Sequence, residues 1–213
     1  LLRIRAAHRA SALAEHFRDQ GKHVLLIMDS LTRVAHARRE IGLALGEQPT
    51  AKGYPASVMS LIPSLVERAG MGDTTSGGSI TGIYTVLADG DDTNDPVVDS
   101  ARAILDGHVV LSRANAQMGI YPAVDISASI SRVMNDIVDP KHLAAARRMR
   151  QLVSLYMENR DLMLMGGYVE GQDADLDQAV KLWPKIVEFI SQRSDSRADF
   201  KTSIRDLLAV AGT

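Results

Sequence analysis

The sequence contains no cysteine, which excludes disulfide bonds and thiolate metal sites and fits a reducing compartment. It also lacks any apolar run near the roughly 18 residues of a membrane-spanning helix, and residues 1–5 already form a helical pattern instead of a signal peptide. The net charge is only −2. This balance argues against an unstructured tail and against a strongly basic protein that binds nucleic acid.

Two further features are missing at the level of motifs. The chain begins with Leu1 instead of methionine, inside a helical pattern, so we expect a piece of a longer protein. The glycine-rich segment 70–78 has no Gly-Lys-Ser/Thr, so it is not a phosphate-binding loop. The 213 residues present are enough for one large or two small domains.

The most informative segment that is present is the apolar run 24–28, which ends in Asp29. A short unbroken apolar run is typical of a central strand in a parallel sheet that helices cover on both faces. Ligands bind at the carboxyl ends of such strands. A carboxylate there is the Walker B arrangement, which holds Mg²⁺, usually through water, beside a nucleotide's phosphates. Taken alone, the pattern more often describes a strand that simply ends in a loop aspartate.

Helical and apolar segments alternate through the first two thirds of the chain. Predicted helices cover 3–20, 31–46, 56–69 and 97–105, and predicted strands cover 79–87, 109–111 and part of 119–125. This alternation predicts an α/β fold with a largely parallel sheet.

From about residue 139 the pattern becomes entirely helical. Pro184 lies inside one of these helices, so we expect a kink or break near Trp183. Three apolar stripes at helical spacing predict a small bundle. The stripes are Ala145, Met149, Leu152 and Tyr156; Leu176, Val180, Trp183, Val187 and Ile190; and Phe200, Ile204, Leu207 and Ala211.

Several ordered motifs resemble those of one family. They are Asp-Ser-Leu-Thr-Arg (29–33), Lys-Gly-Tyr-Pro (52–55), Leu-Val-Glu-Arg-Ala-Gly (65–70), Gly-Ser-Ile-Thr (78–81), Asp-Ser-Ala-Arg-Ala-Ile-Leu-Asp-Gly-His (99–108), Tyr-Pro-Ala-Val-Asp-Ile (121–126) and Ser-Ile-Ser-Arg (129–132). Together they resemble the flagellar and type III protein-export ATPases, relatives of the catalytic subunits of rotary ATP synthases. The resemblance covers essentially the whole chain, and the stretches 166–171 and 182–184 look more flagellar than virulence-type.

The resemblance implies a division into two parts. Residues 1–138 resemble the second half of a RecA-like P-loop nucleotide domain, and residues 139–213 resemble the small C-terminal helical domain. The family's phosphate loop, its catalytic glutamate and its N-terminal β-barrel domain would lie upstream. The segment alone is therefore expected to hydrolyse ATP poorly.

The resemblance also assigns roles to charged residues. Asp29 resembles the carboxylate that organises Mg²⁺. Arg33 resembles the arginine that supports the phosphate site, although a structural ion pair remains an alternative. Arg132 resembles an arginine finger that reaches into a neighbouring subunit's site, whereas by itself it would be interpreted as a surface charge.

Two aromatic residues complete the expected site. Tyr121 and Phe200 resemble the pair that encloses the adenine of ATP, in a slot that would join the two domains, because a flat ring offers a stacking surface. Without the resemblance both would be interpreted as core residues.

The resemblance also implies partners. We expect a cytoplasmic homohexamer that binds ATP and Mg²⁺ at its subunit interfaces, associates peripherally with the export gate at the inner membrane, and does not bind nucleic acid. The acidic loop 89–95 would face the central pore, and the turn 168–175 would act as a lever, although for each segment a solvated acidic loop remains an alternative. A coiled-coil stalk protein and complexes of export chaperones with their substrates would be the partners.

Two other functions remain open at this point. One is a subunit of a rotary ATP synthase. The other is a non-enzymatic interaction module, if the chain is complete as given.

Overall fold

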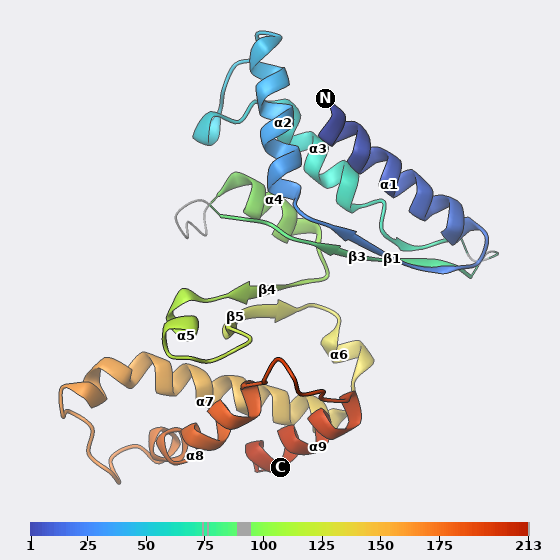
Figure 1. Ribbon diagram of the computed structural model, residues 1–213. Coiled ribbons are helices and arrows are strands. Elements are labelled where there is room, and N and C mark those ends of the chain that lie inside the picture. Colours follow the sequence, from blue (N-terminus) through green and yellow to red (C-terminus); the bar gives the residue numbers. More distant parts are fainter. Residues whose placement is uncertain (74, 76, 89–94, 213) are drawn as a thin grey trace. The chain divides into compact units, whose positions relative to one another are not determined.

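The computed structural model describes residues 1–73, 75, 77–88 and 95–212. The chain divides into two compact units, Leu1–Leu105 and Asp106–Thr213, each with its own core (Figure 1). The predicted domain boundary at 138/139 falls inside the second unit and remains a prediction.

The first unit packs helices against a small sheet of order β1-β3-β2. Strand β1 pairs in parallel with β3, and β2 pairs antiparallel with β3. The elements are α1 (Leu2–Asp19), β1 (His23–Met28), α2 (Leu31–Ala44), the 3₁₀ turn η1 (Ala51–Gly53), α3 (Ala56–Val66), β2 (Gly70–Met71), β3 (Ser79–Tyr84) and α4 (Pro96–Ile104). The predicted helices and strands of this region are thus confirmed, with bounds shifted by a few residues.

Among the described residues the predicted α/β fold with a largely parallel sheet is confirmed in part: β1 and β3 are parallel, but β2 is not. Only the β1–β3 pair is parallel, because the short connection between β2 and β3 cannot make the crossover that parallel strands need. Along β1, Leu26 and Met28 are buried, whereas Leu25 and Ile27 are 59% and 63% exposed. Side chains alternate between the faces of a strand, so one face of β1 packs on the core and the other is open.

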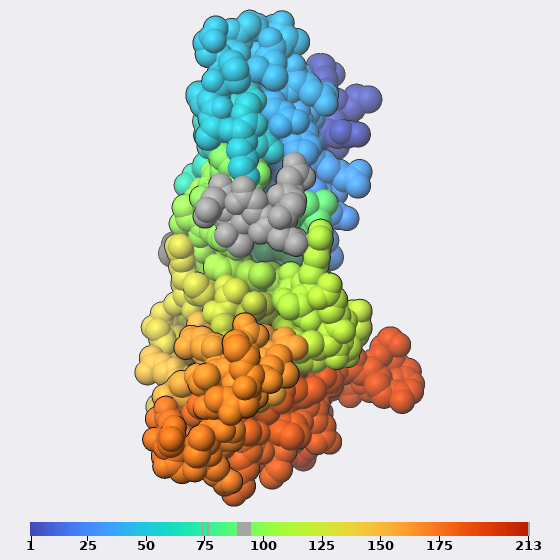
Figure 2. Space-filling model, turned by 90° about the vertical axis from the view of Figure 1, so that its left-hand side faces the viewer, coloured from blue at the N-terminus to red at the C-terminus, as the bar shows by residue number. Residues whose placement is uncertain are grey.

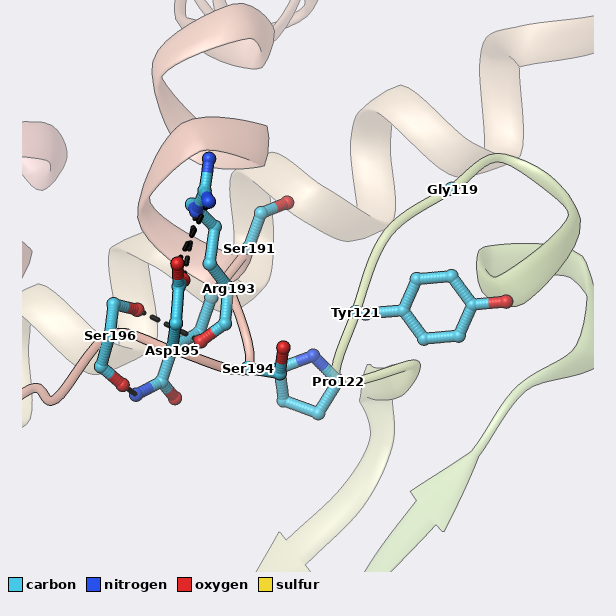
Figure 3. Close-up of a pocket in the computed structure, with 9 residues that line it drawn as sticks. Gly119, Tyr121, Pro122, Ser191, Arg193, Ser194, Asp195 and Ser196 are labelled. Atoms are coloured by element: carbon cyan, nitrogen blue, oxygen red, sulfur yellow. Dashed lines mark hydrogen bonds and ion pairs between the residues drawn. The ribbon is translucent and has the colours of Figure 1, made fainter.

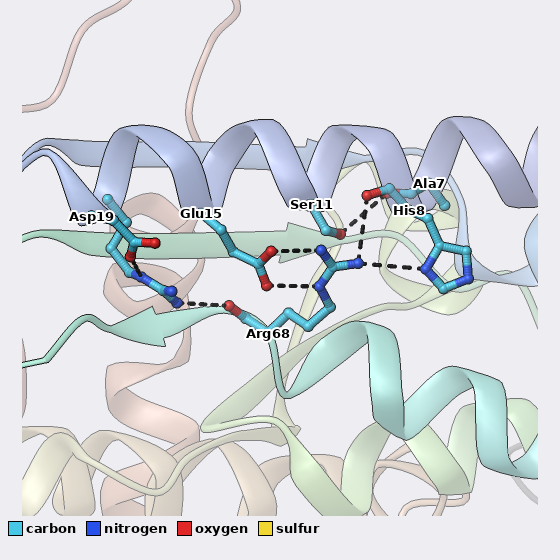
Figure 4. Close-up of polar contacts among 7 residues, drawn as sticks. Ala7, His8, Ser11, Glu15, Asp19 and Arg68 are labelled. Atoms are coloured by element: carbon cyan, nitrogen blue, oxygen red, sulfur yellow. Dashed lines mark hydrogen bonds and ion pairs between the residues drawn. The ribbon is translucent and has the colours of Figure 1, made fainter.

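An ion pair fastens α1 to the segment after α3. The guanidinium of Arg68 donates two hydrogen bonds to the carboxylate of Glu15, at 2.7 and 2.6 Å, and also reaches His8 (Figure 4). The hydrogen bond from Arg68 holds the pKa of Glu15 below its usual value. The paired geometry is the strong form of an arginine–carboxylate contact, and it fixes α1 beside the sheet.

The second unit combines a two-stranded antiparallel ribbon with a helical bundle. Its elements are β4 (Gly107–Leu111), α5 (Arg113–Gln117), β5 (Val124–Ser131), α6 (Met134–Ile137), α7 (Pro140–Leu164), α8 (Ala174–Ile190) and α9 (Phe200–Ala211). Local sequence sets the starts of the long helices: Asp139, Asp173 and Asp199 each accept hydrogen bonds from the first turn of the helix that follows. The prediction of a helical bundle after residue 139 is confirmed.

The bundle core forms where the predicted stripes meet. Its fully buried members are Ala145, Met149, Leu152, Val153, Ala179, Ile186, Leu207 and Ala211. Trp183 of α8 stacks on Tyr156 of α7, with ring centroids 3.8 Å apart and planes 6° from parallel. The predicted stripe of α7 lies in the core, whereas on α8 the buried core residues are Ala179 and Ile186, each one position before a residue of the predicted stripe.

Two details of this unit differ from the predictions. Helix α8 continues through Pro184 without the break that was one of the two predicted outcomes, and a kink there remains a prediction; Ala179 and Ile186 are buried on either side of the proline. Phe200 is 73% exposed and is not a core residue. It is the first residue of α9, ahead of the buried Leu207, and its ring meets the edge of His142 instead.

Among the described residues, no helix is both long enough and apolar enough to cross a lipid bilayer.

Candidate functional site

The carboxyl end of β1 places Asp29 beside the end of β3. Past the paired strands, the backbone N–H of Thr85 donates to the carbonyl of Met28 at 3.1 Å, and the N–H of Leu31 donates to the carbonyl of Thr85 at 3.0 Å. The hydroxyl of Thr85 then donates to Oδ1 of Asp29 at 2.6 Å. Helix α2 begins directly afterwards, with buried Ser30 as its cap.

A pocket of about 310 Å³ opens at this point. Its charged lining is Asp29, Arg33 and Arg3, and the rest comes from small residues of α1, from the end of β1 and from the start of α2. In the part of the chain that the structure describes, none of these three charges forms an ion pair, so the alternative of an Arg33–Asp29 ion pair is not observed. Two guanidiniums and one carboxylate around one pocket suit an anion that arrives with a divalent cation.

Among its lining residues this pocket offers one carboxylate to Mg²⁺, that of Asp29. No cluster of three or more His, Cys, Asp or Glu side chains that could hold a metal occurs among the described residues. Mg²⁺ in nucleotide sites uses one or two carboxylates, with water and phosphates completing the shell. The single exposed carboxylate of Asp29 fits a cation that comes with a nucleotide, but it does not form a permanent metal site.

A second pocket, of about 930 Å³, lies within the second unit (Figure 3). One wall is the loop that carries Gly119, Tyr121 and Pro122, and the other is the segment Ser191–Ser196 after α8. The N–H of Gln192 donates to the carbonyl of Tyr121 at 2.7 Å, which joins the two walls. The Tyr121 ring is 57% exposed, so it offers a face to a flat ligand.

The second wall is polar. Arg193 makes two hydrogen bonds of 2.9 Å to Asp195, and the bonds from Arg193 lower the pKa of that carboxyl. The Gln192 amide and the Ser196 hydroxyl close the segment on itself. In Figure 2 the orange-red segment that follows α8 projects from the body of the second unit. Its groups are therefore open to a ligand or to solvent.

The structure does not bring Phe200 into this pocket. Tyr121 lines the pocket, but Phe200 does not, and its ring contacts His142. The Ser191–Ser196 wall could not be predicted, since a polar loop without a motif gives no signal of its own in the sequence.

Arg132 lies in neither pocket. It directly follows β5, its side chain is exposed, and its backbone N–H donates to the carbonyl of Asp106 at 2.7 Å. Arg132 is therefore not a lining residue of either pocket, and it cannot contact a ligand there as part of the pocket wall.

The turn between α7 and α8 has a defined conformation. The Tyr168 hydroxyl donates to one oxygen of Asp177 at 2.7 Å, and the Gly171 N–H donates to the other at 2.8 Å. The bond to Asp177 raises the pKa of Tyr168 to about 12. Of the predicted lever 168–175, the last two residues belong to α8.

The predicted pore loop 89–95 falls largely outside the described residues. Only Asp95 is described: it is buried and caps α4 through the N–H groups of Val97 and Val98. Lys52 approaches its carboxylate at 3.9 Å.

Comparisons with known proteins match both parts of the chain. Residues 1–131 match the ATP synthase alpha/beta family, nucleotide-binding domain, and residues 138–209 match the T3SS EscN ATPase C-terminal domain. The flagellum-specific ATP synthase of Salmonella typhimurium is 55% identical over 97% of this chain and 45% of its own length. The type 3 secretion system ATPase of Xanthomonas euvesicatoria is 48% identical over 98% of this chain and 46% of its own.

A solved structure agrees with the sequence matches. The assembled ATPase EscN of the enteropathogenic E. coli type III secretion system superposes with a TM-score of 0.91 at 46% identity, over 97% of this chain and 49% of EscN. A further structure shows EscN in complex with its central stalk EscO, with a TM-score of 0.85 at 44% identity over 98% of this chain and 49% of that chain. The chain spans about half the length of the curated relatives that it matches.

Proposed function

Because this chain belongs to the ATP synthase alpha/beta family, we propose that the protein carrying it is the ATPase that energises flagellar or type III protein export. The observation that carries this proposal is the match of residues 138–209 to the C-terminal domain of a secretion ATPase. The same match argues against a rotary synthase subunit. Residues 1–138 then form the second half of a RecA-like domain and residues 139–213 the helical domain, with a boundary near the gap between the two family matches.

We assign the Asp29 pocket to the phosphates and the metal. In this proposal Asp29 orients the water shell of Mg²⁺, and Arg33 faces the phosphates. The bound Mg²⁺ neutralises charge on the transferred phosphoryl group. The support is the convergence of Asp29, Arg33 and Arg3 on one pocket at the end of a strand.

We assign the second pocket to the adenine ring. Tyr121 supplies the stacking surface, and the Ser191–Ser196 segment supplies the opposite wall with groups that can hydrogen-bond a base or ribose. Phe200 does not line this pocket and its ring rests against His142, so its place beside the adenine stays a separate prediction.

We propose that Arg132 acts as an arginine finger on a neighbouring subunit of a homohexamer. Its exposure and its position outside both pockets suit an action between subunits. An arginine supplied in this way accelerates phosphoryl transfer by about 10³–10⁵-fold.

The proposed partners follow from the same family. EscN assembles and binds a central stalk; for this protein we propose a coiled-coil stalk, chaperone–substrate complexes and peripheral attachment to the export gate at the cytoplasmic face of the inner membrane. The turn 168–175, fixed by Asp177, is the proposed lever.

The proposal is tested with the full-length gene product. We expect Arg132→Ala to bind ATP normally but to turn it over at least about a hundredfold more slowly. The exposed Arg205, which pairs with Asp206, gives the matched control Arg205→Ala. Wild-type activity should rise cooperatively with protein concentration.

A mixing experiment separates action in trans from action in cis. Arg132→Ala and Asp29→Asn are each expected to be inactive. If Arg132 serves a neighbour's site, mixed rings contain some interfaces with both native groups, and activity returns. If mixed rings form but show no activity, Arg132 does not act on a neighbouring subunit. If Arg132→Ala alone turns ATP over at the normal rate, Arg132 is not an arginine finger at all.

A further inference from the structure

Two main-chain hydrogen bonds hold Thr85 next to Asp29, one to a residue before Asp29 and one to a residue after it. Its backbone N–H bonds the residue before Asp29, Met28, and its carbonyl accepts from Leu31, two residues after Asp29. These bonds continue the β1–β3 pairing past the ends of both strands. The position of the Thr85 side chain relative to Asp29 is therefore set by the main chain.

The Thr85 side chain uses this position to contact the carboxylate. Oγ1 donates to Oδ1 of Asp29 at 2.6 Å, because an ionised carboxylate can only accept. Over the residues that the structure describes, no other group hydrogen-bonds this carboxylate. One oxygen of Asp29 is thus engaged by Thr85, and the other is left for the pocket.

We infer that Thr85 is a positioning residue for the metal-bearing carboxylate. It fixes the rotamer of Asp29 and occupies one oxygen, so that the other faces the water shell of the cation. Groups that orient a metal-binding carboxylate in this way typically change metal affinity by about 10–100-fold when they are removed. This inference rests on the proposed function of the Asp29 pocket.

A second threonine provides a matched control. Thr32 is buried in the first turn of α2, donates to the carbonyl of Leu87 at 3.2 Å and accepts from its N–H at 2.8 Å. Thr32 and Thr85 thus both tie the segment after β1 to the segment after β3. Thr32 bonds only backbone, whereas Thr85 bonds the carboxylate.

The experiment compares Thr85→Val, Thr85→Ser and Thr32→Val in the full-length protein. Binding of Mn²⁺ in the presence of ADP is measured by electron paramagnetic resonance, and thermal unfolding is measured without nucleotide. We expect Thr85→Val to weaken Mn²⁺ binding about tenfold, at the low end for such groups because the contact runs through water. Thr85→Ser should bind like wild type. Thr32→Val should melt at a lower temperature but keep its Mn²⁺ affinity.

The Mg²⁺ concentration for half-maximal ATPase activity should follow the same order. The inference is overturned if Thr85→Val binds Mn²⁺ as wild type does, if the serine variant is equally impaired, or if Thr32→Val shows the same loss of affinity. A wild-type protein that binds no Mn²⁺ with ADP would overturn the proposed function as well. The two failures are therefore distinguishable.

Discussion

The two pockets of this protein are held by different kinds of structure. The Asp29 pocket lies where a paired strand ends against two helices, and its lining residues Ala7, Met28 and Val34 are buried in or beside the core. The Tyr121 pocket is made of two loops joined by one main-chain hydrogen bond, around a ring that is more than half exposed. If the proposed assignments hold, the charged pocket has its groups at fixed positions, and the pocket proposed for the adenine is built from loops.

This difference has a physical basis. The interaction of a cation with a carboxylate depends on orientation and distance, so a displaced group loses much of its effect. Stacking depends mainly on the area in contact and accepts sliding of one ring over another. Changes in the first pocket should therefore affect turnover, and changes in the second should affect binding.

The largest expected effect comes from Asp29→Asn in the full-length enzyme. The substitution keeps the shape but removes the charge that is proposed to hold the cation, and a bound cation is worth several kcal/mol of transition-state stabilisation, or about a hundredfold or more in kcat. Steady-state kinetics at saturating ATP measure this loss, with exposed Asp206→Asn as control. If the Asp29 variant turns ATP over as fast as wild type, the Asp29 pocket is not the one that determines turnover.

An intermediate effect is expected from Tyr121→Ala. Stacking of a base on an aromatic side chain contributes about 1–3 kcal/mol, so KM for ATP should rise about tenfold while kcat changes little. Tyr121→Phe keeps the ring and should bind like wild type. A fall in kcat at unchanged KM would mean that Tyr121 contributes to turnover and not to the binding of ATP.

The smallest expected effect is a pH dependence of stability that comes from Tyr168, in the turn between α7 and α8. Tyr168 loses its proton near pH 10 in the unfolded chain but only at about 12 in the fold. Between these values the unfolded state binds fewer protons, so the free energy of unfolding should fall as pH rises, and the contribution is fully present below about pH 10. Denaturant unfolding at a series of pH values measures it.

The matched variant is Tyr168→Phe, which lacks the titrating hydroxyl. The difference in stability between wild type and this variant should therefore shrink between pH 10 and 12. A constant difference would show that the bond to Asp177 does not hold the loop.

The elements that could be predicted from the sequence are those with a clear pattern of apolar residues. The strand before Asp29 follows from an unbroken apolar run and the buried face of α7 from apolar spacing, and the structure has both, whereas the α8 stripe is offset by one position from the buried Ala179 and Ile186. The unbroken course of α8 through Pro184 could not be predicted, because packing of α8 against other helices decided it over local preference.

The loop-built pocket was the harder part. Tyr121 was predicted through a motif and lines this pocket, whereas the opposite wall has no periodicity and no motif; Phe200, predicted to face Tyr121, does not line the pocket, and its role stays a prediction. Two loops meet because of contacts between residues far apart in the chain. Thr85 was missed for the same reason, since it follows β3 and its partner Asp29 follows β1, far away in the sequence.

The stacking of Trp183 on Tyr156 gives the chain a built-in optical reporter. Trp183 is its single tryptophan, and its ring lies flat on Tyr156 at the contact between α7 and α8. Tryptophan emission from this chain therefore comes from the helical bundle alone. A change in its intensity or wavelength on addition of a stalk or chaperone would report a shift of α8 against α7, without any introduced label.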